Sequence, residues 1–311
     1  MKPASVVRQH LLDIAQLSDS RIQHIFQRAR QYHQQAHEQH ASQWSQPLAG
    51  YTVALLFYEA STRTRVSFEL AAKRLGAHTV VIQAEASSAT KGETLLDTLN
   101  TLAAMDIDAV VLRHPDDSAA EVIAQQAPAG LSIINAGAGK AAHPSQALLD
   151  VFTVQQQGID IANTKLTIVG DVRHSRVANS NVVLWQRLGA QVRLAAPEYF
   201  QSQQTTHQSL QRFDRLDEAL PDTDVMMMLR IQKERLPATL NLDLSAYQQD
   251  WCLNQSRLQQ LPAHSVVLHP GPMNRDVEIS AEVADGPRAL VLDQVRSGVF
   301  VRMGILHDCL A

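Results

Sequence analysis

The chain has 311 residues, of which 45% are hydrophobic and 19% charged, and its formal net charge is -4. This composition is ordinary for a globular protein, and the length suits two domains of roughly 150 residues each. The negative balance argues against a nucleic-acid partner, and the sequence lacks the run of about eighteen apolar residues that would predict a membrane span. Cys252 and Cys309 are too few and too scattered for a disulfide framework or a zinc site, so we expect a cytoplasmic protein.

Apolar runs alternate with amphipathic segments along most of the chain. The first amphipathic segment predicts a helix with Ser18 or Asp19 as its cap. We then expect buried strands at 52–57, 79–83, 108–112 and 131–135, separated by helices at 65–75, 93–104 and 117–126. A second round predicts strands at 166–169, 191–195, 224–229 and 265–268, with helices near 175–188, 208–219 and 245–260. Apolar strands separated by helices indicate parallel sheets that are covered on both faces.

The alternation therefore predicts an α/β fold with two domains, each a parallel sheet flanked by helices. We place the first domain at 1–143 and the second at 144–290, and we expect the C-terminal helix, 291–311, to pack back on the first. In such sheets ligands gather beyond the carboxyl ends of the strands. The turns that follow strands are therefore the segments to search for a site.

A run of donor-bearing side chains, Ser61-Thr62-Arg63-Thr64-Arg65, follows the strand at 52–57 and precedes a segment of helical spacing. At such a strand-to-helix turn, free backbone N–H groups and the positive end of the helix dipole point outward. With the hydroxyl and guanidinium groups they suit a tetrahedral oxyanion, so we interpret the run as a phosphate site. The alternative is an ordinary helix cap with solvated arginines, which five adjacent donor-bearing residues make less favourable.

Other polar groups follow other strands of the predicted first domain. Arg113 ends the strand at 108–112, where it could polarise a carbonyl group or hold a phosphate oxygen. Pro144 sets the start of a helix, which leaves His143 and Gln146 able to face a cleft. Lys91 lies in a small polar loop that could be a lid or only a loop tip.

The predicted second domain offers groups of a different kind. Arg176 and Arg230 each follow a strand, and together they suit a ligand with two carboxylates. The segment His269-Pro270-Gly271-Pro272 predicts an irregular backbone that allows a cis bond, with carbonyls free for a substrate amine or amide. A phosphorylated acyl donor that meets a dicarboxylate is the reaction class indicated. Positioning and electrostatics could carry such a direct attack, and we expect no cofactor or metal.

These motifs resemble the catalytic chain of the aspartate carbamoyltransferase family. The matching segments occur in family order: Ser61 to Arg65, Ser87 to Glu93, Arg113 to Pro115, His143 to Gln146, Asp171 to Arg176, Arg230 to Arg235 and His269 to Pro272. The resemblance implies transfer of the carbamoyl group of carbamoyl phosphate to the amine of L-aspartate in pyrimidine biosynthesis. The products would be N-carbamoyl-L-aspartate and phosphate, formed by direct attack through a tetrahedral intermediate without a covalent enzyme intermediate.

The same resemblance implies roles for individual residues. It places carbamoyl phosphate on Ser61, Thr62, Arg63, Thr64, Arg113, His143, Gln146, Gly271 and Pro272. It places aspartate on Lys91, Arg176, Arg230 and Gln232. The implied catalytic residues are Arg63, Thr64, Lys91, Arg113 and His143. It also implies a homotrimer in which Ser87 and Lys91 reach a neighbouring active site, and it leaves open a dodecamer with a regulatory or a dihydroorotase-like chain.

Two alternatives compete with this interpretation. Ornithine carbamoyltransferases share the phosphate motif, but that family has a cysteine in a His-Cys-Leu-Pro segment where this chain has His269-Pro270-Gly271-Pro272. A non-catalytic scaffold of the same fold would be expected to have lost some charged site residues. The chain retains all of them: Arg63, Lys91, Arg113, His143, Arg176 and Arg230.

Overall fold

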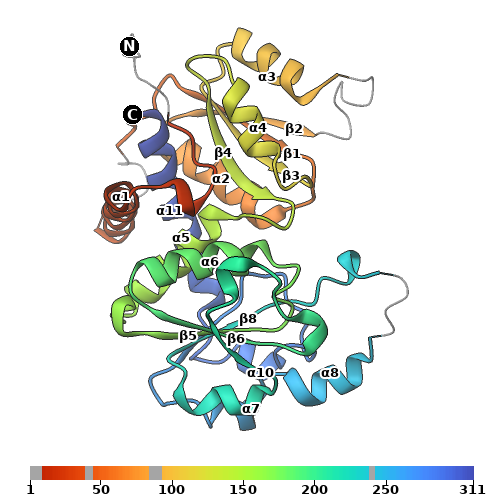
Figure 1. Ribbon diagram of the computed structural model, residues 1–311. Coiled ribbons are helices and arrows are strands. Elements are labelled where there is room, and N and C mark those ends of the chain that lie inside the picture. Colours follow the sequence, from red (N-terminus) through yellow and green to blue (C-terminus); the bar gives the residue numbers. More distant parts are fainter. Residues whose placement is uncertain (1–8, 39–44, 84–92, 238–241) are drawn as a thin grey trace. The chain divides into compact units, whose positions relative to one another are not determined.

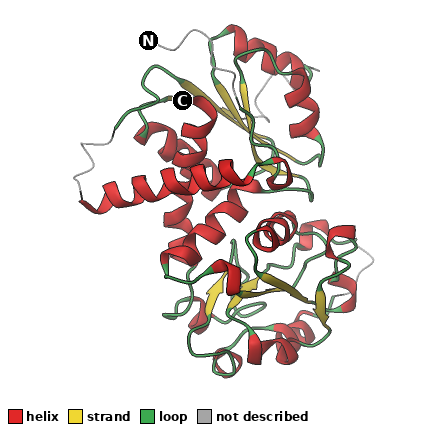
Figure 2. Cartoon of the chain, turned by 60° about the vertical axis from the view of Figure 1, so that its left-hand side comes forward, coloured by secondary structure: helices red, strands yellow, loops and turns green. Residues whose placement is uncertain are grey.

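The structure, a computed structural model, describes residues 9–38, 45–83, 93–237 and 242–311 (Figure 1). The chain divides into two compact units, one of Met1–Leu149 with Val295–Ala311 and the other of Asp150–Gln294. Each unit contains one sheet whose paired strands run parallel, with helices beside the strands (Figure 2). The predicted α/β fold class, with a helix-flanked parallel sheet in each of two parts, is therefore confirmed.

The first unit is built around a four-stranded sheet with the strand order β2-β1-β3-β4. Its strands are β1 (Thr52–Phe57), β2 (His78–Gln83), β3 (Ala109–His114) and β4 (Ser132–Ala138). Its helices are α1 (Asp19–Glu38), α2 (Thr62–Arg74), α3 (Leu95–Ala104), α4 (Ala119–Gln126), the start of α5 (Pro144–Gln156) and most of α11 (Val291–Leu310). The four central side chains of β1 are fully buried, as expected for an apolar strand with a neighbour on each side.

The two edges of this sheet differ. Along β4, the Leu11 N–H donates to the Ile133 carbonyl at 2.9 Å and the Leu11 carbonyl accepts from Asn135 at 2.8 Å. The segment before α1 thus satisfies backbone groups that an edge strand would otherwise leave unpaired. Along β2, by contrast, Val80 and Val81 are 41% and 42% exposed.

Helix α11 packs closely on α1 within the first unit. A Cβ atom added at Gly304 would lie 2.7 Å from the Ile25 carbonyl oxygen, so only glycine allows this approach. At the N-terminus of α1, the Arg21 N–H donates to the Ser18 hydroxyl at 3.2 Å. Ser18, rather than Asp19, therefore caps the helix.

The second unit contains a five-stranded sheet with the strand order β7-β6-β5-β8-β9. Its strands are β5 (Lys165–Val169), β6 (Gln191–Ala195), β7 (Gln211–Phe213), β8 (Val225–Met228) and β9 (Val266–Leu268). Its complete helices are α6 (Arg176–Arg187), α7 (Leu216–Ala219), α8 (Leu244–Trp251), α9 (Gln255–Leu258) and α10 (Ala281–Ala284). The three methionines of β8 are fully buried core residues.

Two of the predicted helices are wrong in part. Within 208–219, Gln211–Phe213 form β7 and only Leu216–Ala219 is α-helical. The helix predicted at 245–260 is divided, because the Asn254 side chain accepts a hydrogen bond from the Arg257 N–H at 3.0 Å and starts α9 as a separate helix.

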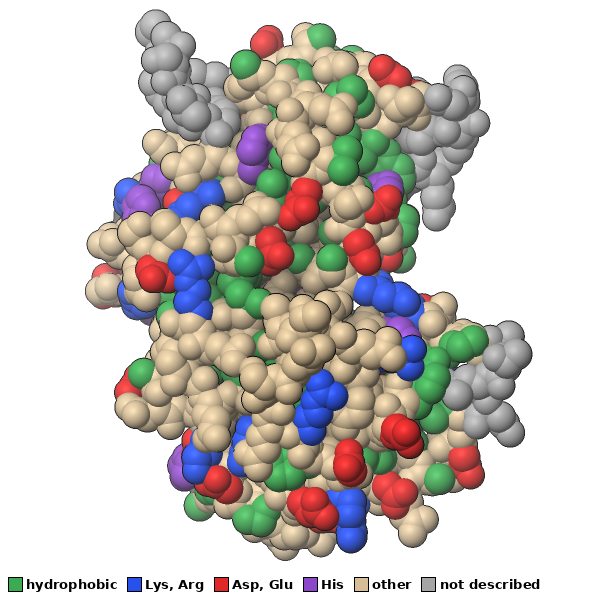
Figure 3. All heavy atoms as spheres, in the orientation of Figure 1, with side chains coloured by type: hydrophobic (Ala, Val, Ile, Leu, Met, Phe, Trp, Pro, Cys, Tyr) green, Lys and Arg blue, Asp and Glu red, His purple; other side chains and the backbone are tan. Residues whose placement is uncertain are grey.

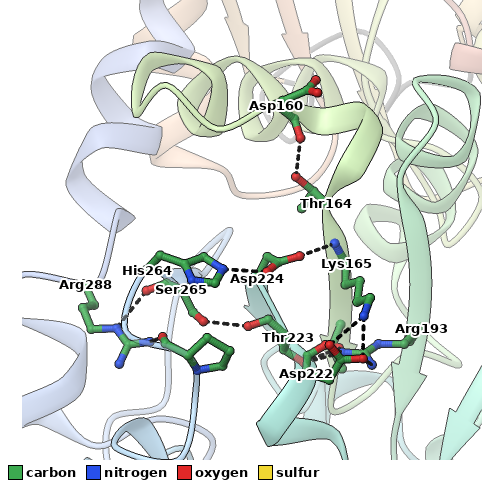
Figure 4. A network of polar contacts seen from close by, with 12 residues as sticks. Asp160, Thr164, Lys165, Arg193, Asp222, Thr223, Asp224, His264, Ser265 and Arg288 are labelled. Carbon is green, nitrogen blue, oxygen red and sulfur yellow. Dashed lines mark hydrogen bonds and ion pairs between the residues drawn. The ribbon is translucent and has the colours of Figure 1, made fainter.

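A buried arginine links three neighbouring strands of the second unit (Figure 4). Arg193, on β6, is 3% exposed. Its Nη2 donates to the Thr167 hydroxyl at 3.0 Å and to the Thr223 hydroxyl at 2.7 Å, and also to the Asp222 carbonyl. Next to it, Asp224 accepts from the Lys165 N–H at 2.8 Å. Side chains thus join the middle of β5 and β6 to the segment that leads into β8, away from the turns that follow the strands.

Candidate active site

The donor-rich run of the first unit lies at the turn between β1 and α2. Ser61 is the N-cap residue of α2, and the first backbone hydrogen bond of the helix runs from the Arg65 N–H to the Ser61 carbonyl at 3.1 Å. The Ser61 hydroxyl accepts no capping hydrogen bond from the described residues of α2. In an ordinary N-cap this hydroxyl would accept a hydrogen bond from a backbone N–H of the first helical turn. The geometry therefore favours an anion site over the alternative of a simple cap.

The other residues of this turn differ in exposure. Thr62 and Arg63 are exposed, whereas Thr64 is only 6% exposed. The first turn of an α-helix carries N–H groups that have no partner within the helix. Together with the hydroxyl and guanidinium groups, the turn therefore presents several donors to one small anion.

Arg113 lies at the same edge of the sheet as this turn. It pairs in register with Phe57, the last residue of β1. Its Nε is 3.2 Å from Glu59 Oε2, and its Nη1 donates to the Ala136 carbonyl at 3.4 Å. The guanidinium is thereby held between the turn after β1 and the end of β4. Glu59 was not identified from the sequence, although it stands two residues before the phosphate motif.

His143 and Gln146 lie where β4 leads into α5, which begins at Pro144. They are 4% and 8% exposed. The turn after β4 is tied to the turn after β3, because the Gly139 N–H donates to the His114 carbonyl at 2.9 Å. Three neighbouring strands of one sheet thus deliver the predicted carbamoyl phosphate residues of the first unit to its carboxyl edge.

In the second unit, Arg230 follows β8 and is engaged by a carboxylate. Its Nη1 donates to Glu234 Oε2 at 3.1 Å, and its Nη2 pairs with Oε1 of the same residue. Partial burial opposes ionisation, but hydrogen bonds from Arg230 and from the backbone lower the pKa of Glu234 on balance. Arg230 is therefore oriented to hold a carboxylate with both nitrogens.

A buried Asp–His pair joins the turns after β5 and β8. His174 Nδ1 lies 2.7 Å from Asp171 Oδ1, and the His174 carbonyl accepts from Gln232 Nε2 and from Arg235 Nη1, both at 2.9 Å. The Gln232 N–H donates to Asp171 Oδ2 at 3.2 Å. Arg176, the first residue of α6, follows this pair and is 7% exposed. The predicted aspartate residues of this unit thus come from two adjacent strands.

The segment after β9 contains the remaining predicted residues, Gly271 and Pro272. The bond between them is cis, as the two prolines of the motif allow. The Gly271 N–H donates to His269 Nδ1 at 2.9 Å. The predicted carbamoyl phosphate residues are therefore divided, with these two in the second unit and the others in the first.

Two of the predicted residues, Ser87 and Lys91, lie outside the described residues. Within the described part of the chain, no group of three or more His, Cys, Asp and Glu side chains is placed to hold a metal ion. None of the described helices is both long and apolar enough to cross a membrane. On the face seen in Figure 3, Lys and Arg side chains are interspersed with Asp and Glu.

Curated relatives resemble the chain over most of its length. It is 50% identical over 260 residues to the aspartate carbamoyltransferase catalytic subunit of Pelotomaculum thermopropionicum, which covers 84% of each chain. It is 42% identical over 304 residues to the protein of the same name from Legionella pneumophila, which covers 97% of this chain and 99% of the relative.

Solved structures show the same similarity. Aspartate transcarbamoylase from Trypanosoma cruzi in complex with N-(phosphonacetyl)-L-aspartic acid superposes with a TM-score of 0.89 at 31% identity, over 100% of this chain and 98% of that one. The complex of that enzyme with carbamoyl phosphate and aspartate gives a TM-score of 0.87 at 30% identity, with the same coverage.

Family models match both parts of the chain. Residues 9–156 match the carbamoyl-P binding domain of aspartate/ornithine carbamoyltransferases, and residues 162–309 match their Asp/Orn binding domain. The first match contains the turn after β1, and the second contains Arg176 and Arg230. The chain therefore belongs to the aspartate/ornithine carbamoyltransferase family.

Proposed function

We propose that the chain is the catalytic subunit of an aspartate carbamoyltransferase, which forms N-carbamoyl-L-aspartate and phosphate in pyrimidine biosynthesis. The observation that carries this proposal is the turn after β1, where Ser61 stands at the N-cap but leaves its hydroxyl out of the cap. The bidentate pairing of Arg230 with a carboxylate supports an acidic second substrate. The names of the relatives and the ligands of the Trypanosoma cruzi structures agree with this choice.

The proposed substrate contacts follow from these two sets of residues. The carbamoyl phosphate contacts are Ser61, Thr62, Arg63, Thr64, Arg113, His143, Gln146, Gly271 and Pro272. The aspartate contacts are Arg176, Arg230, Gln232 and Lys91, the last by sequence resemblance only. Arginine suits both ligands, because its planar fork of donors matches the oxygens of phosphate and carboxylate.

The proposed chemistry is direct attack. The amine nitrogen of aspartate bonds to the carbamoyl carbon, and a tetrahedral intermediate forms. The bond from that carbon to the phosphate oxygen then breaks, and the amine proton leaves with the phosphate. Arg113 and His143 would stabilise the charge on the carbonyl oxygen, while Arg63 and Thr64 would hold the departing phosphate.

The two cysteines agree with a mechanism that has no covalent enzyme intermediate. Both are free thiols and buried. Burial raises the pKa of Cys252 to about 11 and that of Cys309 to about 12, so neither is a thiolate at neutral pH. Two reduced thiols also fit the cytoplasm, which we propose as the compartment.

We further propose a homotrimer with shared active sites. The sequence resemblance implies it, and the β2 edge of the first sheet supports it. Val80 and Val81 on this edge strand are exposed, as are Val66 and Leu70 on the neighbouring helix α2, each to 41% or 42%. Exposed apolar side chains on and beside a strand that forms the edge of the sheet in the described part of the chain are typical of a subunit interface. A mass measurement on the native particle would distinguish a trimer from a monomer or a dodecamer.

The substrate proposal is tested by incubating the purified chain with carbamoyl phosphate and either L-aspartate or L-ornithine. We expect N-carbamoyl-L-aspartate in the first reaction and no product in the second. Product from ornithine alone would identify an ornithine carbamoyltransferase. Turnover with neither amino acid would instead support the non-catalytic scaffold.

A further inference from the structure

The segment after β9 is held by a buried pair of side chains, His269 and Glu278. They are 1% and 0% exposed, and His269 Nε2 lies 3.2 Å from Glu278 Oε1. The other ring nitrogen, Nδ1, accepts the Gly271 N–H at 2.9 Å. The imidazole therefore connects a buried carboxylate with the backbone just before the Gly271–Pro272 bond.

These contacts define the tautomer of His269. An N–H group can only donate, so Nδ1 must be the unprotonated nitrogen that accepts from Gly271. The ring hydrogen of the neutral imidazole then lies on Nε2, where it is donated to Glu278.

Glu278 also holds the far end of the segment. Its Oε1 accepts from the Asn274 N–H at 2.6 Å, in addition to facing His269. One carboxylate oxygen thus ties a residue before the Gly271–Pro272 bond to a residue after it. A buried carboxylate needs such donors, because without them its desolvation is costly.

The main chain of His269 is fixed by a second buried network. Its N–H donates to Gln294 Oε1 at 2.9 Å, and Gln294 Nε2 donates to Asp150 Oδ1 at 2.7 Å. The other oxygen of Asp150 accepts from Asn181 Nδ2 at 2.9 Å. Asp150 and Asn181 are fully buried. The position of the imidazole is therefore set from α5 and α6 as well as from Glu278.

We propose that His269 and Glu278 are positioning residues that orient the backbone carbonyls at Gly271 and Pro272 toward the amide group of the carbamoyl donor. Through Gly271 the imidazole would set the direction of this backbone, and Glu278 would hold the imidazole. This proposal rests on the proposed function, since it assumes that the segment meets carbamoyl phosphate. It adds a specific consequence, namely that the pair acts on recognition of the donor's NH₂ group.

Acetyl phosphate separates this role from a purely structural one. It carries a methyl group where carbamoyl phosphate carries NH₂, so it cannot donate to the backbone carbonyls. Both acyl donors carry the same phosphate group and react with the same acceptor, aspartate. The donor ratio is kcat/KM for carbamoyl phosphate divided by kcat/KM for acetyl phosphate. It therefore reports the contacts of the NH₂ group.

Two substitutions of His269 each keep one of the two contacts of the imidazole and remove the other. In His269→Asn the amide oxygen takes the place of Nδ1 and can accept from the N–H two residues later, as in an Asx turn. In His269→Gln the longer amide takes the place of Nε2 and can donate only to Glu278. We expect His269→Asn to keep the donor ratio within about threefold and His269→Gln to lower it about tenfold, with acetyl transfer little changed.

Glu278 provides an independent pair of variants that leaves His269 in place. Glu278→Gln keeps an oxygen that can accept from His269 and Asn274, whereas Glu278→Leu removes it. We expect the donor ratio to persist in the first and to fall in the second. Thermal unfolding and the affinity for inorganic phosphate, measured for every variant, show whether the fold and the phosphate site are intact.

The proposal is overturned if His269→Gln and Glu278→Leu keep the wild-type donor ratio. It is also overturned if both donors lose activity equally as the melting temperature falls, which is the result of a structural role alone. Failure of the proposed function is distinguishable, because the wild-type chain would then carbamoylate no aspartate at all.

Discussion

Both terminal nitrogens of the Arg230 guanidinium contact the Glu234 carboxylate: Nη1 lies 3.1 Å from Oε2, and Nη2 pairs with Oε1. Both residues belong to the turn after β8, and their side chains are 25% and 55% exposed. A substrate carboxylate that binds Arg230 must therefore take the place of a carboxylate already present. The exchange is feasible, because an exposed ion pair of this kind contributes little net stability.

Replacing Arg230 by alanine should raise the KM for aspartate by about 30-fold or more, because a charge-assisted contact with the substrate is lost. The affinity for inorganic phosphate should stay within about twofold of the wild-type value. Steady-state kinetics with varied aspartate and calorimetry with phosphate measure the two effects. Arg215, exposed in the same unit, supplies the control variant Arg215→Ala. An equal loss of both affinities would place Arg230 in the fold or in the phosphate site.

Arg63→Ala should chiefly remove the use of carbamoyl phosphate. Loss of a charge-assisted contact to the departing phosphate should cost about 3 kcal/mol of transition-state stabilisation, or roughly a hundredfold in kcat/KM. Lys73→Ala is the matched control, since Lys73 is an exposed cation on the same helix and pairs with Glu69 at 2.6 Å. An unchanged rate in Arg63→Ala would mean that Arg63 is only a residue of the helix start.

Mixed oligomers test the sharing of active sites between subunits. Lys91→Ala and Arg63→Ala subunits should each be nearly inactive alone. After dissociation and reassembly together, some interfaces would receive Lys91 from one chain and Arg63 from the other. Activity should then return in part, as measured on the reassembled mixture. Well-mixed hybrids that stay as inactive as their parents would show that Lys91 works within its own subunit.

Arg193→Met should destabilise the second unit without a change in the KM for aspartate. The substitution removes the buried guanidinium that donates to the Thr167 and Thr223 hydroxyls and to the Asp222 carbonyl, and it leaves the hydrogen bond between the two hydroxyls, at 2.8 Å. This loss should cost about 3 kcal/mol in the free energy of unfolding. Urea unfolding measures the loss, and Arg215→Met on the surface is the control. A stability equal to that of the wild type would show that well-packed apolar atoms replace the network without cost.

The unfolding free energy should also depend on pH through His207, which is fully buried and whose Nδ1 lies 2.6 Å from the Ser202 hydroxyl. Burial, with a smaller effect from Arg212, lowers the pKa of His207 to about 4. Because the folded pKa is below the unfolded value near 6.5, stability is complete above about pH 6.5 and falls as the pH drops toward 4. Urea unfolding at several pH values should show the loss, which His207→Gln should reduce. An identical acid dependence in His207→Gln would assign the loss to other groups.

The parts of the fold that the sequence predicts best are those determined by local pattern. The strands at 52–57 and 191–195 match β1 and β6 to the residue. β1 could be predicted because its apolar run marks a strand that is buried on both faces, whereas β6, which contains Gln191 and Arg193, could be predicted from the alternation of strands and helices along the chain. β7 could not, because Gln211 and Arg212 are exposed at a sheet edge and only their pairing with Arg193 and Leu194 of β6 makes them a strand.

The candidate site also has a part that the sequence predicts and a part that it does not. The turn at Ser61 could be located from the sequence, because its donors are adjacent and follow an apolar run. The supporting pairs could not, because their partners are distant in the chain or lack a motif of their own. Gln232 contacts His174 from 58 positions along the chain, and Glu278 lies nine positions after His269, beyond a segment of irregular backbone. Such contacts depend on which strands become neighbours, and local sequence does not specify that.

The most direct test of the central claim is a competition between acceptors. The purified chain is given ¹³C-labelled carbamoyl phosphate with equal amounts of L-aspartate and L-ornithine, and the products are separated by mass. The proposed function predicts that the label is found in N-carbamoyl-L-aspartate, with one phosphate released for each product molecule, and that Arg63→Ala slows its formation by roughly a hundredfold. Label in the carbamoylated ornithine instead, or phosphate release without any carbamoylated amino acid, would contradict it.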